Sequence, residues 1–221
     1  MKIGLVCGLQ AEARALSSLR DHADLMVGIS GARPDKASQL AESMIASGAE
    51  VLVSWGIAGG LDPELPSGAL IVPRAVVLPD GDQIDLAGLP SFEGRSEHLI
   101  AGSDAVVATP DGKIALRSRS GAAAVDMETH CTARVARDAG RICIAIRAIS
   151  DPADRTLPSG TENAVDESGK PRILPVIAGL IRRPASLGAL LAAKRDFDTA
   201  LATLSTSGVD LLREALGREL R

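Results

Sequence analysis

Aromatic residues are scarce in this 221-residue chain, which has one tryptophan, two phenylalanines and no tyrosine. Proteins that bind single-stranded nucleic acid stack bases on several aromatic side chains, so this mode of binding is not expected. Positive charge is not in excess either, because 24 Lys and Arg against 28 Asp and Glu give a net charge of −4. Without a basic field to hold a phosphate backbone, we expect no nucleic-acid partner.

Cysteine and long apolar runs are also limited. The three cysteines, Cys7, Cys131 and Cys143, are far apart and show neither CxxC nor Cys/His ligand spacing. We therefore expect no metal site and a reducing compartment, the cytoplasm. The longest uncharged apolar stretch, residues 173–181, ends at two arginines, well short of the roughly 20 residues that a membrane-spanning helix needs.

Short runs rich in Val, Ile and Leu alternate with longer segments of helical period, which is typical of an α/β domain. Glycines at the C-terminal caps mark two of the helix ends. We predict one domain over residues 1–221, with a mixed, mostly parallel central sheet flanked by helices. The predicted strands are 2–7, 24–29, 50–55, 69–78, 99–108, 122–125 and 142–149, and the predicted helices are 11–19, 35–47 and 127–139.

The last third of the chain has a different composition. Residues 152–172 are rich in Pro, Gly, Ser and acidic residues, which predicts a loop or lid beside the site. Residues 173–221 carry leucines at helical spacing, which predicts a helical tail. Basic residues gather between 167 and 196. They indicate contact with an anionic membrane surface, or a helix edge packed on the domain or on a dimer partner.

Polar residues and glycines follow four of the predicted strands. They are Glu12 after the first strand, the glycine-rich segment 56–60 after the third, Glu128 after the sixth, and Asp151 after the seventh. Ligands of parallel sheets bind beyond the carboxyl ends of the strands. We therefore predict that the three carboxylates line one cavity.

Each of these features also has a purely structural interpretation. Glu12 fits an acidic residue in the first turn of a helix, and Asp151 before Pro152 fits a turn. The glycine-rich segment is neither a Walker A loop nor a GxGxxG fingerprint. Gly59 and its neighbours either form a tight turn or let the backbone approach a ligand closely.

The order and spacing of four segments carry a family resemblance: 2–12, 56–61 with 68–72, 124–128, and 147–151. Over about residues 1–154 the chain resembles the superfamily of purine nucleoside phosphorylases and methylthioadenosine/S-adenosylhomocysteine nucleosidases. Residues 151–158 and the leucine-rich tail look most like the hopanoid-associated phosphorylase branch. That branch implies adenosylhopane, a lipid-linked adenosine, as substrate.

The resemblance implies cleavage of a purine N-ribosidic bond by a homodimer without metal or organic cofactor. Asp151 would protonate the purine at N7, which suits a transition state that places negative charge on the departing base. Glu128 would accept hydrogen bonds from the ribose hydroxyls, with Met127 packed against the sugar. Ser150 would orient the base or Asp151, unless it is only a turn residue. Arg147 fits a structural ion pair as well as a ligand contact.

The family divides by the group that attacks the ribose. Phosphorylases have arginines where this chain has Glu12 and Ser54, and a hydroxyl residue where it has Ile57. A carboxylate repels phosphate but can position and deprotonate water, so hydrolysis is favoured. Arg33 supports the alternative, phosphorolysis, because it offers a cation for inorganic phosphate. A third hypothesis, from another class, is a non-catalytic protein that binds purine nucleosides.

Recognition of the base is less well defined. Many relatives stack an aromatic side chain on the purine from the position that Val106 occupies here. Trp55 or Phe92 would take over stacking, although a lone tryptophan beside glycines more often packs in the core.

Overall fold

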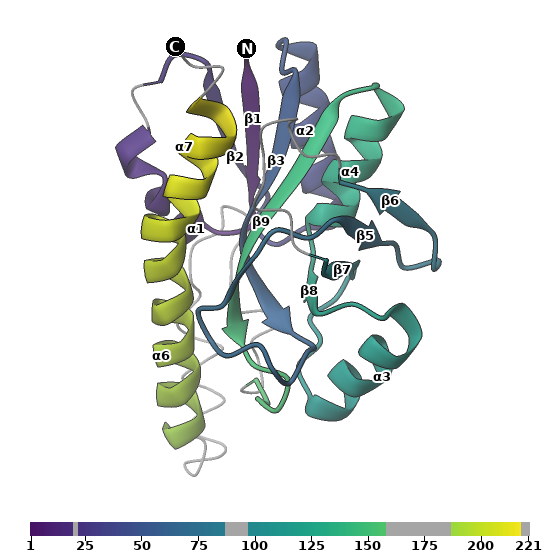
Figure 1. Cartoon of the computed structure of the whole chain (residues 1–221), viewed down its shortest axis with the longest axis vertical. Helices are drawn as coiled ribbons and strands as arrows, with labels where there is room; N and C mark the ends of the chain where they lie inside the picture. Colours follow the sequence, from purple (N-terminus) through teal and green to yellow (C-terminus); the bar gives the residue numbers. More distant parts are fainter. Residues whose placement is uncertain (20–21, 87–96, 158–186, 218–221) are drawn as a thin grey trace.

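The computed structural model describes residues 1–19, 22–86, 97–157 and 187–217 (Figure 1). Their strands form a nine-stranded sheet in the order β2-β1-β3-β8-β7-β5-β6, with β9 beside β3 and β4 beside β9. The pairs β1/β2, β1/β3, β3/β9, β5/β7 and β7/β8 are parallel, whereas β3/β8, β4/β9 and β5/β6 are antiparallel. The strands are β1 (Ile3–Cys7), β2 (Leu25–Ile29), β3 (Val51–Gly60), β4 (Leu70–Ile71), β5 (Ala75–Val77), β6 (Gln83–Asp85), β7 (Leu99–Gly102), β8 (Ala124–Asp126) and β9 (Ile142–Asp151).

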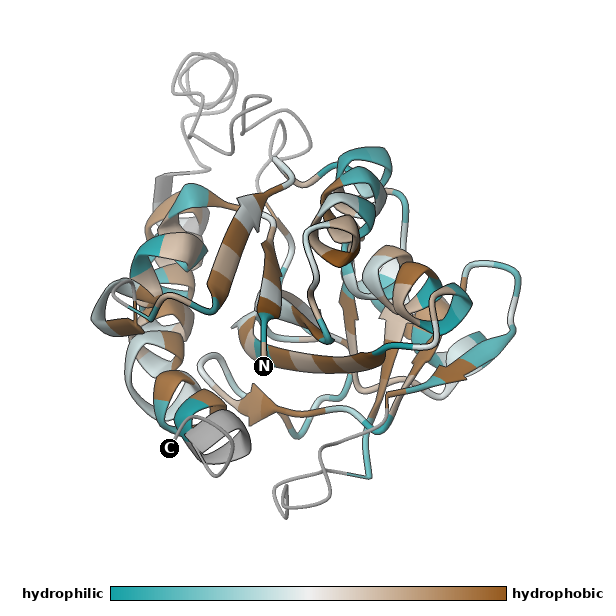
Figure 2. Cartoon of the chain, turned by 90° about the horizontal axis from the view of Figure 1, so that it is seen from above, coloured by the Kyte–Doolittle hydropathy of each residue, from teal (hydrophilic) through white to brown (hydrophobic). Residues whose placement is uncertain are grey.

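Helices cover both faces of the sheet, as seen from above in Figure 2. One face packs on α1 (Gln10–Ala15), α6 (Leu187–Thr203) and α7 (Val209–Gly217), and the other on α2 (Pro34–Ala46) and α4 (Thr129–Asp138). Buried Val, Ile and Leu of β1, β3 and β9 alternate between these two layers. The α/β prediction, with a mixed and mostly parallel sheet, is therefore confirmed.

The predicted strand 69–78 is wrong as a single element. It splits into β4, which pairs with β9, and β5, which pairs with β6 and β7. Pro73 lies between them, and a proline has no N–H to donate to a sheet ladder. The segments before and after Pro73 therefore pair with different strands of the sheet.

The glycine-rich segment after the third predicted strand is not a loop. It forms the second half of β3, which runs to Gly60 and pairs with both β9 and β8. The strand predicted over 142–149 likewise extends to Asp151, whereas the one predicted over 99–108 ends at Gly102. Asp151, which was expected to follow the strand, is therefore the last residue of β9.

Several helical predictions also need correction. The helix predicted over 11–19 ends at Ala15 and is followed by a 3₁₀ turn, η1 (Ser17–Leu19). Helix α3 (Pro110–Ser120) and strand β6 were not predicted. The signals for α3 are present, because Thr109 caps its first turn and Gly121 adopts the left-handed conformation at its end.

In the region predicted as a helical tail, residues 187–217 form α6 and α7, joined by a π-helical segment, η4 (Leu204–Gly208). Residues 173–186 and 218–221, most of the predicted lid 152–172, and Phe92 lie outside the described residues. Within the described ranges, no helix has both the length and the apolarity to span a bilayer.

Candidate active site

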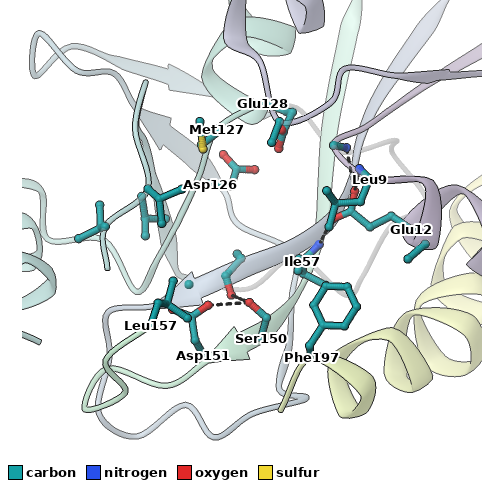
Figure 3. A pocket seen from close by; sticks show the side chains of 18 of the residues that line it. Leu9, Glu12, Ile57, Asp126, Met127, Glu128, Ser150, Asp151, Leu157 and Phe197 are labelled. Atoms are coloured by element: carbon teal, nitrogen blue, oxygen red, sulfur yellow. Dashed lines mark hydrogen bonds between the residues drawn. The ribbon is translucent and has the colours of Figure 1, made fainter. Parts of the chain in front are cut away.

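A cavity of about 750 Å³ opens at the carboxyl ends of β1, β3, β8 and β9 (Figure 3). This volume suits a nucleoside-sized ligand. The cavity brings together Glu12, Glu128 and Asp151, which are remote from one another in the sequence. The predicted substrate-binding residues Met127, Ser150, Gly59 and Val106 also line it.

A β-bulge in the sheet places Asp151 at the cavity wall. The parallel register of β3 and β9 pairs Ala58 with Ile149 but Gly59 with Asp151, so Ser150 is an extra residue on β9. Bulges redirect side chains and are frequent next to active sites. The hydroxyl of Ser150 donates to Oδ1 of Asp151 at 2.6 Å. Ser150 therefore orients the carboxyl group that the sequence singled out as the acid.

The carboxyl group of Asp151 is almost fully buried. Burial raises its pKa, and the neighbouring Lys113 ammonium, 2.7 Å from Oδ2, opposes that shift. A buried carboxyl group with a raised pKa holds a proton more readily at neutral pH, as a general acid requires.

Glu12 is held by backbone donors from the segment after β1 and from β3. Its Oε2 accepts hydrogen bonds from the N–H groups of Gly8 at 2.7 Å and Leu9 at 2.8 Å, and its Oε1 accepts one from Ile57 at 2.9 Å. A carboxylate has about four lone-pair sites, so Oε1, with one backbone donor, keeps one acceptor site. Glu12 therefore stabilises the start of α1, as its structural interpretation holds, and also lines the site.

Glycine makes room for these carboxylates. A Cβ on Gly56 would lie 2.5 Å from both Glu12 Oε1 and Arg147 Nη1, and one on Gly8 would lie 2.8 Å from Glu128 Oε1. Neither distance is possible for a real side chain. These two glycines let acidic side chains approach the backbone, a different role from the close ligand approach that the sequence suggested.

A buried arginine balances the acidic residues behind the cavity. Arg147, fully buried on β9, forms an ion pair with Asp126 at 2.6 Å and lies 3.6 Å from Glu128 Oε2. Its guanidinium also donates to the hydroxyl of Ser54, and the hydroxyl of Thr129 donates to Asp126. The structure thus gives Arg147 its structural role, with Asp126 as the closest partner.

The burial and crowding of these acidic residues affect the pKa of Glu128 most clearly. Burial, followed by the charges of Asp126 and Glu12, raises its pKa to about 8, against the opposing effect of Arg147. Burial also raises the pKa of Glu12, and Arg147 and the three backbone donors oppose that shift. At neutral pH a protonated Glu128 is therefore favoured.

The raised pKa of Glu128 predicts a pH-dependent stability difference. Between the ordinary value of 4.5 and about 8 the folded state binds more protons than the unfolded state, so stability falls as the pH rises through this window. Since one pKa unit corresponds to about 1.4 kcal/mol, Glu128→Gln should become more stable than the native protein by a few kcal/mol above pH 8. Urea unfolding of both proteins from pH 5 to pH 9 measures this difference.

The matched control is Glu42→Gln, which makes the same change at an exposed position of α2. Its stability relative to the native protein should stay constant over the same pH range. If the stability difference between Glu128→Gln and the native protein were also constant over this pH range, Glu128 would not have the raised pKa described above.

Two predicted residues do not reach the cavity. Arg33, the candidate phosphate ligand, is absent from the lining and its guanidinium pairs with Asp35 at 2.7 Å on the surface. Trp55 is fully buried in the core and its indole N–H donates to the carbonyl oxygen of Glu12. Its role is packing and support of Glu12, not base stacking.

Two residues at the site were missed by the sequence analysis. Lys113 lies on the unpredicted helix α3, and no pattern in the sequence connects it with Asp151. Phe197 of α6 lines the cavity, although its place in the apolar stripe of the tail predicted only packing. An aromatic side chain is thus present, on a different element from the one that carries Val106.

The arrangement has the parts of an acid–base site for cleaving a polar bond. A carboxylate with a free acceptor position, Glu12, and a carboxyl group with a raised pKa, Asp151, lie on different walls of one cavity (Figure 3). Pairs of carboxyl groups with different environments take the roles of base and acid in glycoside hydrolysis. Among the described residues, no group of His, Cys, Asp and Glu is arranged to hold a metal ion.

Comparison with known proteins is consistent with this geometry. The family model described as Phosphorylase superfamily matches residues 95–181. Among solved structures, the Helicobacter pylori 5′-methylthioadenosine/S-adenosyl homocysteine nucleosidase has a TM-score of 0.72 at 19% identity, covering 99% of this chain and 98% of that one. The futalosine hydrolase of Helicobacter pylori gives the same values. A comparison with the curated proteins gave no match.

A third solved structure, the 5′-methylthioadenosine/S-adenosylhomocysteine nucleosidase from Neisseria meningitidis, has a TM-score of 0.68 at 17% identity, covering 98% of this chain and 99% of that one. At these identities the likeness establishes the fold, which this chain shares over its whole length. The fold and the family match together support the phosphorylase superfamily. Within it they support an enzyme of the nucleosidase or nucleoside phosphorylase type.

Proposed function

We propose that the protein cleaves the N-ribosidic bond of a 5′-substituted adenosine and releases adenine, with water as the attacking group. The observation that carries this proposal is the single cavity shared by Glu12, Glu128 and Asp151. Asp151 protonates the base at N7, Glu128 holds the ribose hydroxyls with Met127 against the sugar, and Glu12 positions and deprotonates the water. Ser150 orients Asp151, and Gly59 and Val106 form part of the wall around the base.

The charge of the cavity wall supports hydrolysis over phosphorolysis. Among the described residues that line the cavity, Arg14 is the one cation, against four carboxyl groups, those of Glu12, Asp126, Glu128 and Asp151. Those of the four that are ionised would repel a phosphate dianion, whereas water carries no such penalty. Arg33, the cation that favoured phosphorolysis, is absent from this lining.

The apolar part of the cavity lining supports an apolar 5′ substituent. Besides Val106, apolar side chains from separate segments of the chain line the cavity: Leu9, Val107, Leu157 and Phe197. A hydrocarbon group is stabilised by about 25 cal/mol for each Å² it buries against such a surface. A lipid-linked adenosine such as adenosylhopane, the substrate that the sequence resemblance implies, is therefore included in the proposal.

The last part of the proposal concerns the oligomeric state and the cellular location of the enzyme. We infer a cytoplasmic homodimer whose basic segment touches the inner membrane. Lys194 and Arg195 of this segment lie exposed on α6, where they can face anionic lipid.

The decisive experiment measures both products with and without inorganic phosphate. Purified protein is incubated with 5′-methylthioadenosine, S-adenosylhomocysteine, inosine and a lipid-linked adenosine, and the base and the sugar product are quantified. From the three adenosine compounds we expect adenine and the free sugar at a rate that phosphate does not change. Formation of the sugar 1-phosphate, only when phosphate is present, would show phosphorolysis instead. Binding of nucleosides without release of any base would identify a non-catalytic nucleoside-binding protein.

A further inference from the structure

A lysine on α3 reaches Asp151 from behind the cavity wall. Lys113 is 1% exposed, and its Nζ lies 2.7 Å from Oδ2 of Asp151. The same ammonium donates to the backbone carbonyl oxygens of Asp151 at 3.1 Å, Pro152 at 2.7 Å and Arg155 at 3.3 Å. Lys113 is absent from the cavity lining, so it acts on the site only through these groups.

The burial of this ammonium is costly, since removing a charge from water costs several kcal/mol unless partners replace the water. A methionine has nearly the same length and would fill the position without that cost. A methionine would also leave three backbone carbonyl oxygens without this donor, so the lysine fastens the turn after β9 as well; its ion pair with Asp151 is the contact that bears on the chemistry. The loss of the Asp151 proton leaves a carboxylate within 2.7 Å of a cation.

We propose that Lys113 is the positioning residue of the general acid: it holds the Asp151 carboxyl group at the cavity wall and stabilises the carboxylate formed when the base is protonated. This inference rests on the proposed function. As the bond between C1′ and N9 breaks, the proton of Asp151 passes to N7, so the base leaves as neutral adenine. The attacking water forms the new bond to C1′ and gives one proton to Glu12; Glu12 then releases this proton to solvent, and Asp151 takes one back from solvent.

The other charges near Asp151 leave Lys113 as its direct partner. Asp196 of α6 also acts on Asp151, and its negative charge favours the protonated form. Arg155 pairs with Asp196 at 2.8 Å and not with Asp151. Among the described residues, Lys113 is thus the one cation paired with the acid, and Ser150 supplies the neutral hydrogen bond at the other carboxyl oxygen.

The test compares Lys113→Met and Lys113→Gln with the native protein over a range of pH, using adenine release as the readout. Lys113→Met removes the charge, and Lys113→Gln removes it while keeping an N–H donor for the carbonyl oxygens of Pro152 and its neighbours. If Lys113→Met fails to fold, Lys113→Gln still carries the test. The matched control is Arg117→Gln on the same helix, which removes a cation paired with Asp62 instead.

We expect both Lys113 variants to lower the maximal kcat by about tenfold or more, while KM changes less than about threefold. The alkaline limb of the pH profile, where Asp151 loses its proton, should move to higher pH by about one unit, because an opposite charge at this distance favours the ionised form. Arg117→Gln should leave that limb in place. A purely structural role of Lys113 would lower the amount of active enzyme without moving the limb.

The inference is overturned if the native protein releases adenine and the alkaline limb of both Lys113 variants coincides with that of the native protein. The proposed function then still stands. If the native protein releases no base from any of the four nucleosides, the proposed function fails, and the inference about Lys113 fails with it.

Discussion

Replacing Asp151 with asparagine should lower kcat for adenine release by about 10²- to 10⁴-fold, the usual contribution of a general acid. The amide keeps the size of the side chain and can still accept the hydrogen bond from Ser150. It has no proton to give to N7, so the base must leave as an anion. Base release is measured from initial rates, and the thermal unfolding midpoint shows that the fold is kept.

A substrate with a reactive leaving group separates loss of the acid from loss of the site. A 4-nitrophenyl riboside needs no protonation to depart, so Asp151→Asn should cleave it at a rate close to that of the native protein. Asp154→Asn, three residues along on an exposed turn, is the matched control and should not affect either substrate. Adenine release by Asp151→Asn at a near-native rate would remove Asp151 from the mechanism.

Replacing Glu12 with glutamine should reduce kcat by a similar factor, about 10²- to 10⁴-fold, because the amide cannot take a proton from water. The change also affects stability. The carboxylate accepts three backbone N–H groups, whereas an amide that accepts two of them turns its own NH₂ toward the third. One buried donor left without a partner costs about 1–3 kcal/mol, which urea unfolding detects.

Two measurements distinguish the catalytic effect of Glu12→Gln from a damaged site. The dissociation constant for a nucleoside, measured by calorimetry, should change by less than about tenfold, because the other walls of the cavity are kept. In the native protein, activity should rise with pH through a pKa above 4.5, since burial raises the pKa of Glu12, and this acidic limb should disappear in Glu12→Gln. Glu12→Gln enzyme that hydrolyses nucleosides at the native rate would assign the water to another group.

The residues that the sequence brought to attention share one property: they come at the carboxyl ends of apolar, strand-like runs. Glu12, Glu128 and Asp151 were expected together because parallel strands place their carboxyl ends at one edge of a sheet, although β8, which precedes Glu128, is antiparallel to β3. Arg33 also follows a strand end but does not line the cavity, because a position next to a strand end does not determine which way a side chain points. Its guanidinium pairs with Asp35, two residues away.

The amino-acid sequence by itself determined the α/β class, the approximate strands and the acidic residues at their ends, because apolar periodicity and turn residues act over short distances. The tertiary structure alone decided what surrounds each acid. The bulge at Ser150 depends on the register between β3 and β9. The pairing of Lys113 with Asp151 joins residues 38 positions apart, and the crowding of Glu12 and Glu128 arises only when three strands meet. Burial and opposing charge set the pKa of each carboxyl group, and neither exists until the chain has folded.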